Sequence, residues 1–114
     1  MPIKTGLTEE RRKRLDEELK RLVPEIIKLD VEKVILFGSL AKGKIHKASD
    51  IDLIIVKRTE KRFLDRLDEF YSRLNPRVGV DIFVYTPEEF AEMKDHNPFL
   101  KKAIEEGVII YEKR

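Results

Sequence analysis

The chain has 114 residues, a length that fits one compact domain, and we expect residues 1–114 to form a single unit. It carries 24 basic and 22 acidic residues, and the net charge of +2 gives no strong signal for a nucleic-acid or membrane partner. The absence of cysteine excludes disulfides and thiolate metal sites, and no apolar run approaches the roughly 20 residues of a membrane span. No signal peptide opens the chain, so we expect a soluble cytoplasmic protein.

A long amphipathic helix is predicted first, after a loose lead-in at residues 1–7. Thr8 is suited to the N-cap position of this helix. Leucine and isoleucine then recur at intervals of 4, 3, 4 and 3 over Leu15–Leu29, which predicts one apolar face. Pro24 removes a backbone donor inside this pattern and predicts a kink or a split. The basic run at residues 11–14 is expected on the solvated side of the helix.

Three apolar segments predict strands at Val34–Phe37, Ile51–Val56 and Val78–Tyr85. A second amphipathic helix is expected over about residues 60–74, between the last two strands. Because such a helix is a crossover connection, it favours parallel pairing of the strands that it joins. The short link between the first two strands favours antiparallel pairing.

The last part of the chain predicts two more helices and an edge strand. Thr86 is a cap for a helix that begins at Pro87, and Glu89 completes a capping box. Another helix is expected to begin at Asn97-Pro98, with an edge strand after it at Val108–Tyr111. The predicted fold class is α/β (α+β), a small mixed β-sheet of three or four strands with helices packed on it.

Three aspartates stand in or beside the apolar strands, namely Asp50, Asp52 and Asp81. Asp50 and Asp52 are two residues apart, so along a strand both side chains point to one face. Parallel pairing of the second and third strands would place Asp81 close to Asp52. Three carboxylates repel one another unless cations neutralise them, and hard oxygen ligands suit Mg²⁺ or Mn²⁺. Two such ions, about 4 Å apart, are a standard device for transferring phosphoryl and nucleotidyl groups.

A glycine–serine turn at the end of the first strand is the candidate phosphate site. Gly38 lets the backbone approach a ligand closely, and the Ser39 hydroxyl can donate to a phosphate oxygen. A short helix is expected from Leu40, and its free N–H groups favour an anion. Lys42 lies beside this turn and is a candidate contact for a triphosphate; the alternative is a solvated position on a basic rim.

The stretch GSLAKGKIHKASDIDL, followed by VDIFV, resembles the nucleotidyltransferase superfamily that includes DNA polymerase beta. The pattern of that superfamily is Gly-Ser, a spacer, Asp-x-Asp and a third acid on a later strand. Here the spacer between Ser39 and Asp50 is ten residues long, and the resemblance covers residues 34–85. It implies the nucleotidyltransferase fold, in which a mixed sheet carries the acids.

The resemblance also implies a role for each of these residues. Asp50 and Asp52 would bind two Mg²⁺ ions, and Asp81 would bind the ion that activates the acceptor hydroxyl. Gly38 and Ser39 would hold the β and γ phosphates of a nucleoside triphosphate, for which ATP is the simplest choice. The implied reaction is transfer of AMP to an acceptor hydroxyl, with release of pyrophosphate.

Family members of this size resemble the antitoxin half of a toxin–antitoxin module whose other half is a helical HEPN protein. In such modules the transferase adds AMP to a tyrosine of the toxin, so we expect a protein adenylyltransferase with a HEPN-type partner. Two alternatives stay open: a nucleotide-binding antitoxin that acts by complex formation alone, and a transferase for a small molecule or an RNA end. Base preference and the oligomeric state, including a homo-oligomer, also stay open.

Overall fold

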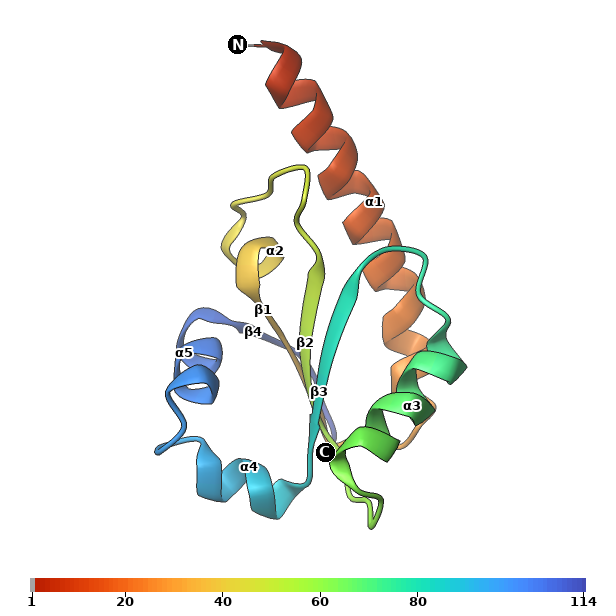
Figure 1. Cartoon of the computed structure of the whole chain (residues 1–114), viewed down its shortest axis with the longest axis vertical. Helices are drawn as coiled ribbons and strands as arrows, with labels where there is room; N and C mark the ends of the chain where they lie inside the picture. The colour runs from red at the N-terminus through yellow and green to blue at the C-terminus, as the bar shows by residue number, and fades with distance from the viewer. Residues whose placement is uncertain (1) are drawn as a thin grey trace.

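The structure, a computed structural model, describes residues 2–114 (Figure 1). The helices in this range are α1 (Pro2–Ile27), α2 (Gly38–Lys42), α3 (Phe63–Leu74), α4 (Pro87–Met93) and α5 (Pro98–Glu106). The strands are β1 (Lys33–Phe37), β2 (Ile51–Val56), β3 (Val80–Tyr85) and β4 (Val108–Glu112). They form one sheet in the order β3-β2-β1-β4. The mixed α/β architecture predicted from the sequence is therefore confirmed.

The directions of the strands bring the termini of three of them together at one end of the sheet. The crossover through α3 makes β2 and β3 parallel, whereas β1 runs antiparallel to both of its neighbours, β2 and β4. As a result the end of β1 meets the beginnings of β2 and β3. The register places Asp52 opposite Phe37 on one side and opposite Asp81 on the other.

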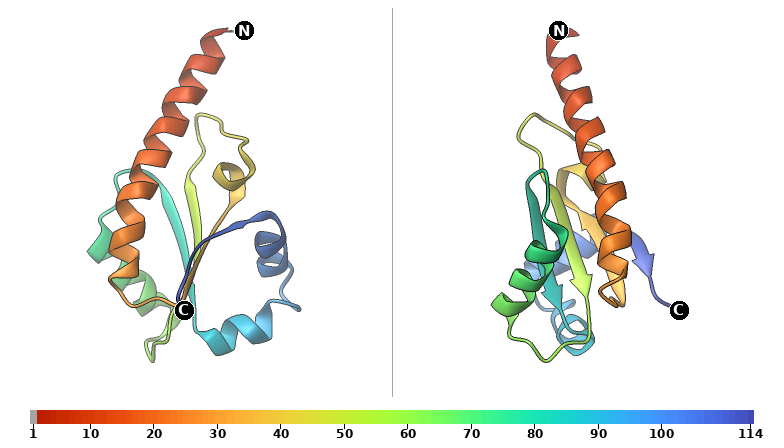
Figure 2. Two further views of the ribbon diagram at one scale, coloured as in Figure 1. Left: turned by 180° about the vertical axis from the view of Figure 1, so that it is seen from behind. Right: turned by 90° about the vertical axis from the view of Figure 1, so that its right-hand side faces the viewer.

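Helices cover both faces of the sheet, with α1 and α3 on one side and α4 and α5 on the other (Figures 1 and 2). Because side chains alternate along a strand, each strand supplies residues to two apolar layers. The larger layer joins Leu53 of β2 to Leu22 of α1 and Phe70 of α3. The smaller layer joins Ile54 of β2 to Leu100 of α5. Asp52 and Ile54 are two residues apart in β2, so both side chains point to the face of the sheet that carries α5.

The beginning of α1 differs from the prediction. The sequence predicts a lead-in up to residue 7 and a cap at Thr8, but α1 begins at Pro2 and contains Thr8 in its interior; Met1 lies outside the described residues. Proline is well tolerated at the first helical position, because a backbone N–H there has no acceptor within the helix in any case. Pro24 does not split the helix, which continues to Ile27. No helix within residues 2–114 is long and apolar enough to cross a membrane.

The remaining boundaries agree with the prediction to within a few residues. The helix expected from about residue 60 begins at Phe63, and the strand expected from Val78 begins at Val80. The capping box is confirmed: the Glu89 backbone N–H donates to Thr86 Oγ1 at 3.1 Å, and the Thr86 N–H donates to Glu89 Oε1 at 2.9 Å. The predicted edge strand is confirmed as β4.

Two large apolar side chains, Phe63 and Phe99, are partly exposed. Phe63 is 38% exposed and Phe99 is 42% exposed, because each lies in the first turn of its helix, where one side faces solvent. Phe99 nevertheless packs against two other rings, with centroids 5.5 Å from Phe37 and 5.0 Å from Phe83. This ring cluster lies on the same face of the sheet as Asp52 and Asp81.

Candidate active site

The structure brings Asp52 and Asp81 together at the edge of the sheet where β2 and β3 begin. They are direct neighbours in the parallel register, close enough for Asp81 to perturb the Asp52 carboxyl. Burial of the Asp52 carboxyl, reinforced by the charge of Asp81, raises the pKa of Asp52 to about 6. Asp81 is the exposed member of the pair. Two carboxylates held this close repel each other, and a bound cation would relieve that repulsion.

Asp50 is held at the margin of this pair. The Arg11 guanidinium donates to the Ser49 carbonyl oxygen from Nε at 2.9 Å and from Nη2 at 2.6 Å. The same Nη2 lies 3.3 Å from Asp50 Oδ1. On the other side, a Cβ at Gly79 would overlap the Asp50 carboxylate, so Asp50 occupies a slot that only a glycine leaves open. Its charge still contributes to the raised pKa of Asp52.

The three acids are therefore not a preformed metal cage. Among residues 2–114 there is no group of three histidine, aspartate or glutamate side chains close enough together to hold an ion. The Asp52–Asp81 pair supplies the oxygen donors that a hard divalent cation prefers, and its partial burial raises the benefit of neutralising it. Rotation of Asp50 away from Arg11 would add a third carboxylate, so the residues present fit a divalent ion.

The glycine–serine turn packs directly against this pair. Gly38 has φ of +75°, and a Cβ at this position would overlap the Asp52 carboxylate. The sequence predicts that Gly38 lets a ligand approach the backbone. The structure adds that the missing side chain of Gly38 leaves room for the Asp52 carboxylate. Ser39 Oγ donates to Ser49 Oγ at 3.1 Å, and Ser49 Oγ accepts from the His46 N–H at 2.9 Å. The buried Ser49 thus joins the turn to the loop that leads into β2.

Lys42, the candidate triphosphate contact, lies at the rim of a cavity of 230 Å³ between α2 and α5. Its Nζ is 2.7 Å from Glu106 Oε1 of α5. The cavity also contacts Gly38 and the rings of Phe37 and Phe99. Lys42 therefore borders the turn but is engaged by a carboxylate in this structure.

Two arginines that the sequence places in solvent instead hold the loop between α2 and β2. Arg11 binds Ser49 and Asp50, and Arg12 Nη2 donates to the Gly43 carbonyl oxygen at 3.1 Å. The correction has a simple physical reason: the N-terminal half of α1 passes along this loop (Figure 1). Arg11 precedes Leu15 by four residues, so it continues the buried stripe of α1 by one turn. This spacing is the sequence feature that indicates a position of Arg11 against the protein.

Comparison with known proteins agrees with this geometry. The family model for the nucleotidyltransferase domain matches residues 12–111. A Methanocaldococcus jannaschii protein provisionally named a protein adenylyltransferase is 32% identical over 90 residues, which cover 79% of this chain and 84% of the relative. A Haemophilus influenzae protein provisionally named protein adenylyltransferase MntA is 38% identical over 79 residues, covering 66% of this chain and 64% of the relative.

A solved structure extends the comparison to the fold. A crystal structure from Sulfolobus solfataricus, provisionally described as a nucleotidyltransferase, superposes with a TM-score of 0.66 at 27% identity. The match covers 94% of this chain and 88% of that one. The family model reaches from α1 into β4 and so includes the three aspartates and the Gly38–Ser39 turn. The chain therefore belongs to the nucleotidyltransferase domain family.

Proposed function

We propose that this enzyme is a protein adenylyltransferase that moves AMP from ATP to a tyrosine hydroxyl of a helical, HEPN-type partner protein. The observation that carries the proposal is the Asp52–Asp81 carboxyl pair, packed against the Gly38–Ser39 turn at one sheet edge. The names of the relatives support a protein as the acceptor. The toxin–antitoxin setting follows from the resemblance of the chain, in its size and motifs, to the antitoxin half of such modules.

The reaction balances as a single displacement at the α phosphorus. The acceptor oxygen forms a new bond to this phosphorus while the bond from the phosphorus to the oxygen that bridges to the β phosphate breaks. Pyrophosphate leaves with that electron pair. The acceptor proton passes to a carboxylate oxygen of Asp81, which is exposed and can release it to solvent.

Each residue of the site has a part in this scheme. Asp52 and Asp81 would hold the divalent ions, and Asp50 would add a third carboxylate if it turned away from Arg11. When bound, Mg²⁺ or Mn²⁺ supplies Lewis acidity that lowers the pKa of the acceptor hydroxyl and offsets charge on the phosphates. Gly38 and Ser39 offer a backbone N–H and a hydroxyl to the β and γ phosphates.

Tyrosine suits such a site as acceptor. Its ordinary pKa is about 10, so a bound cation needs to lower it by only a few units to give an oxyanion near neutral pH. A serine hydroxyl would require a far larger shift. Orientation of the acceptor supplies much of the rate of such reactions, so transfer should depend on a docked partner rather than on a free small molecule.

Intact-mass measurement of the partner tests this function. The chain is incubated with ATP, Mg²⁺ and each short all-helical protein encoded beside it, and the partner should gain one AMP mass or a few in series. Asp52→Asn should abolish the gain, while Asp68→Asn, an exposed aspartate of α3, should leave it intact. A tight complex without added mass, formed equally by Asp52→Asn, would instead support an antitoxin that acts by binding. Transfer to an antibiotic or an RNA end alone would overturn the choice of acceptor.

A further inference from the structure

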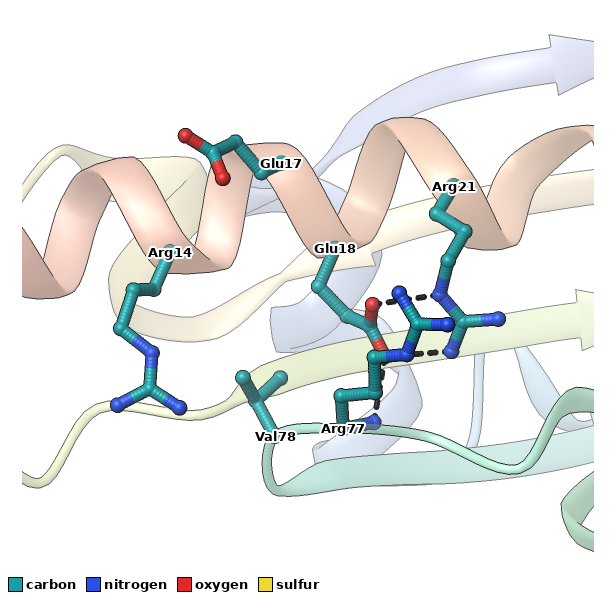
Figure 3. A pocket seen from close by; sticks show the side chains of 6 residues that line it. All are labelled: Arg14, Glu17, Glu18, Arg21, Arg77 and Val78. Carbon is teal, nitrogen blue, oxygen red and sulfur yellow. Dashed lines mark hydrogen bonds and ion pairs between the residues drawn. The ribbon is translucent and has the colours of Figure 1, made fainter.

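A groove separates α1 from the segment that leads into β3 (Figure 3). It encloses 330 Å³. Its lining consists of three arginines, two glutamates and a valine: Arg14, Glu17, Glu18, Arg21, Arg77 and Val78. We call it the arginine groove.

The arginine groove carries an excess of positive charge. Glu18 is buried and is held by Arg21 through Nε at 2.8 Å and Nη2 at 2.7 Å, and it also accepts the Arg77 backbone N–H at 2.6 Å. The hydrogen bond from Arg21 keeps the pKa of Glu18 below its ordinary value, so this carboxylate stays ionised and fully used. Glu17 also lines the groove, although its carboxylate points away from Glu18 (Figure 3). Three guanidinium groups against two carboxylates leave a net positive charge, and Arg14 and Arg77 are the two arginines of the groove without an ion pair among residues 2–114.

Arg14 is the most available of these cations. It is exposed and has no ion-pair or hydrogen-bond partner among residues 2–114. Its guanidinium extends from the same side of α1 as the Glu18 side chain (Figure 3). An unpaired cation on the wall of a concave site is suited to a carboxylate from another molecule.

Both walls of the arginine groove lead to Asp50. On α1, Arg14 lies three residues, and so one helical turn, from Arg11, whose Nη2 is 3.3 Å from Asp50 Oδ1. On the opposite wall, Val78 is followed by Gly79, which packs against the Asp50 carboxylate. The arginine groove lies on the face of the sheet that carries α1, so a chain lying in it can reach the carboxyl pair on the other face by passing Asp50, just before β2 begins.

The groove also lies on the side from which an acceptor should arrive. The sheet order β3-β2-β1 puts the Gly38–Ser39 turn beyond β2 on one flank and the segment before β3 on the other. In phosphoryl and nucleotidyl transfer the attacking and leaving oxygens are roughly in line on opposite sides of phosphorus. With pyrophosphate leaving on the β1 flank, the acceptor hydroxyl comes from the β3 flank, beside the arginine groove.

We propose that the arginine groove is the docking site for an acidic segment of the acceptor protein, bound through Arg14 and Arg77. This inference rests on the proposed function, since it names the chemistry by which that site selects its protein acceptor. Carboxylates of the acceptor pair with the two guanidinium groups and place a nearby hydroxyl beside the Asp52–Asp81 pair. The partner is thereby recognised by charge outside the catalytic residues.

A defined anionic probe tests this site. Fluorescein-labelled poly(Glu,Tyr) supplies acidic side chains and tyrosine hydroxyls together, and its binding is measured by fluorescence anisotropy, with poly(Lys,Tyr) as the basic counterpart. The variants are Arg14→Glu, Arg77→Gln and the two combined. Lys20→Glu is the matched control, because this exposed lysine lies on the flank of α1 that borders Ile110 of β4. Binding of a fluorescent ATP analogue with Mg²⁺ and thermal melts verify that each variant is folded.

The unaltered chain should bind poly(Glu,Tyr) and not poly(Lys,Tyr). The double variant should bind it about tenfold more weakly, the loss expected from two partly exposed ion pairs, with unchanged nucleotide affinity. Lys20→Glu should stay within about twofold of the unaltered chain. Equal binding by the double variant overturns the proposal, as does arginine-dependent binding of an oligo(A) RNA without binding of the acidic polymer. If the acidic polymer binds in an arginine-dependent way but no AMP is transferred, the proposed function is overturned and the groove is not. If the double variant labels the partner as well as the unaltered chain does, the docking role of the groove is overturned and the proposed function is not.

Discussion

Replacing Asp52 by asparagine should stabilise the metal-free protein while abolishing its activity. The raised pKa of Asp52, about 6 against an ordinary 3.8, means that the folded state resists ionisation of this carboxyl. Stability is therefore fully present below the unfolded pKa and falls as pH rises from about 3.8 to about 6. Asparagine carries no charge and can still donate to Asp81, so the variant escapes this loss.

The size of the effect follows from the shift. A difference of roughly two pKa units corresponds to about 3 kcal/mol at neutral pH, and because Asp52 is only partly buried, solvent screening reduces this to about 1–2 kcal/mol. For a chain of this length that is about 4–8 °C in melting temperature. At pH 4.5 the advantage of Asp52→Asn should shrink to roughly a third, since much of the Asp52 population is then protonated in the folded state.

Thermal melts in EDTA at pH 4.5 and 7.5 provide the measurement, with Asp68→Asn as the control at an exposed site. Added Mg²⁺ should raise the melting temperature of the unaltered chain more than that of Asp52→Asn, because a ligand stabilises the state that binds it. A lower melting temperature for Asp52→Asn at pH 7.5, or a difference that does not change with pH, would refute the reasoning.

Three further predictions concern the turn and the scaffold. Gly38→Ala should lower the free energy of unfolding in urea by about 1–3 kcal/mol and weaken Mg-ATP binding, because Gly38 has a positive φ and a Cβ there would overlap Asp52. Unchanged stability of this variant would contradict the packing of Gly38 against Asp52. Ser39→Ala should weaken Mg-ATP binding by about 1–3 kcal/mol in calorimetry, and equal affinity would place the triphosphate elsewhere. Arg66→Met should cost about 2–4 kcal/mol in urea melts without changing nucleotide affinity, because the buried guanidinium donates to the Lys61 and Val84 carbonyls and to Glu89.

The sheet and the carboxyl pair were predictable because they depend on local rules. Strand periodicity fixes which residues share a face, and the crossover helix fixes the parallel pairing that sets Asp81 beside Asp52. The capping box at Thr86 likewise depends on only four consecutive residues.

The position of α1 relative to the loop before β2 could not be predicted in the same way. Arg11 and Ser49 are 38 residues apart, and their contact depends on the packing of a helix against a sheet edge. For this reason the sequence pattern alone predicts a solvated Arg11 and an Asp50 that joins Asp52 and Asp81 directly. The buried stripe of α1, traced back one turn from Leu15, indicates that Arg11 faces the protein.

Labelling the two ends of ATP separately gives the most direct test of nucleotidyl transfer at this site. The chain and its helical partner are incubated with Mg²⁺ and ATP labelled at either the α or the γ phosphate. The partner should retain the α label only, the γ label should leave as pyrophosphate, and Asp52→Asn should transfer neither. Retention of the γ label, or transfer of the α label by Asp52→Asn at the rate of the unaltered chain, would contradict nucleotidyl transfer by the Asp52–Asp81 site.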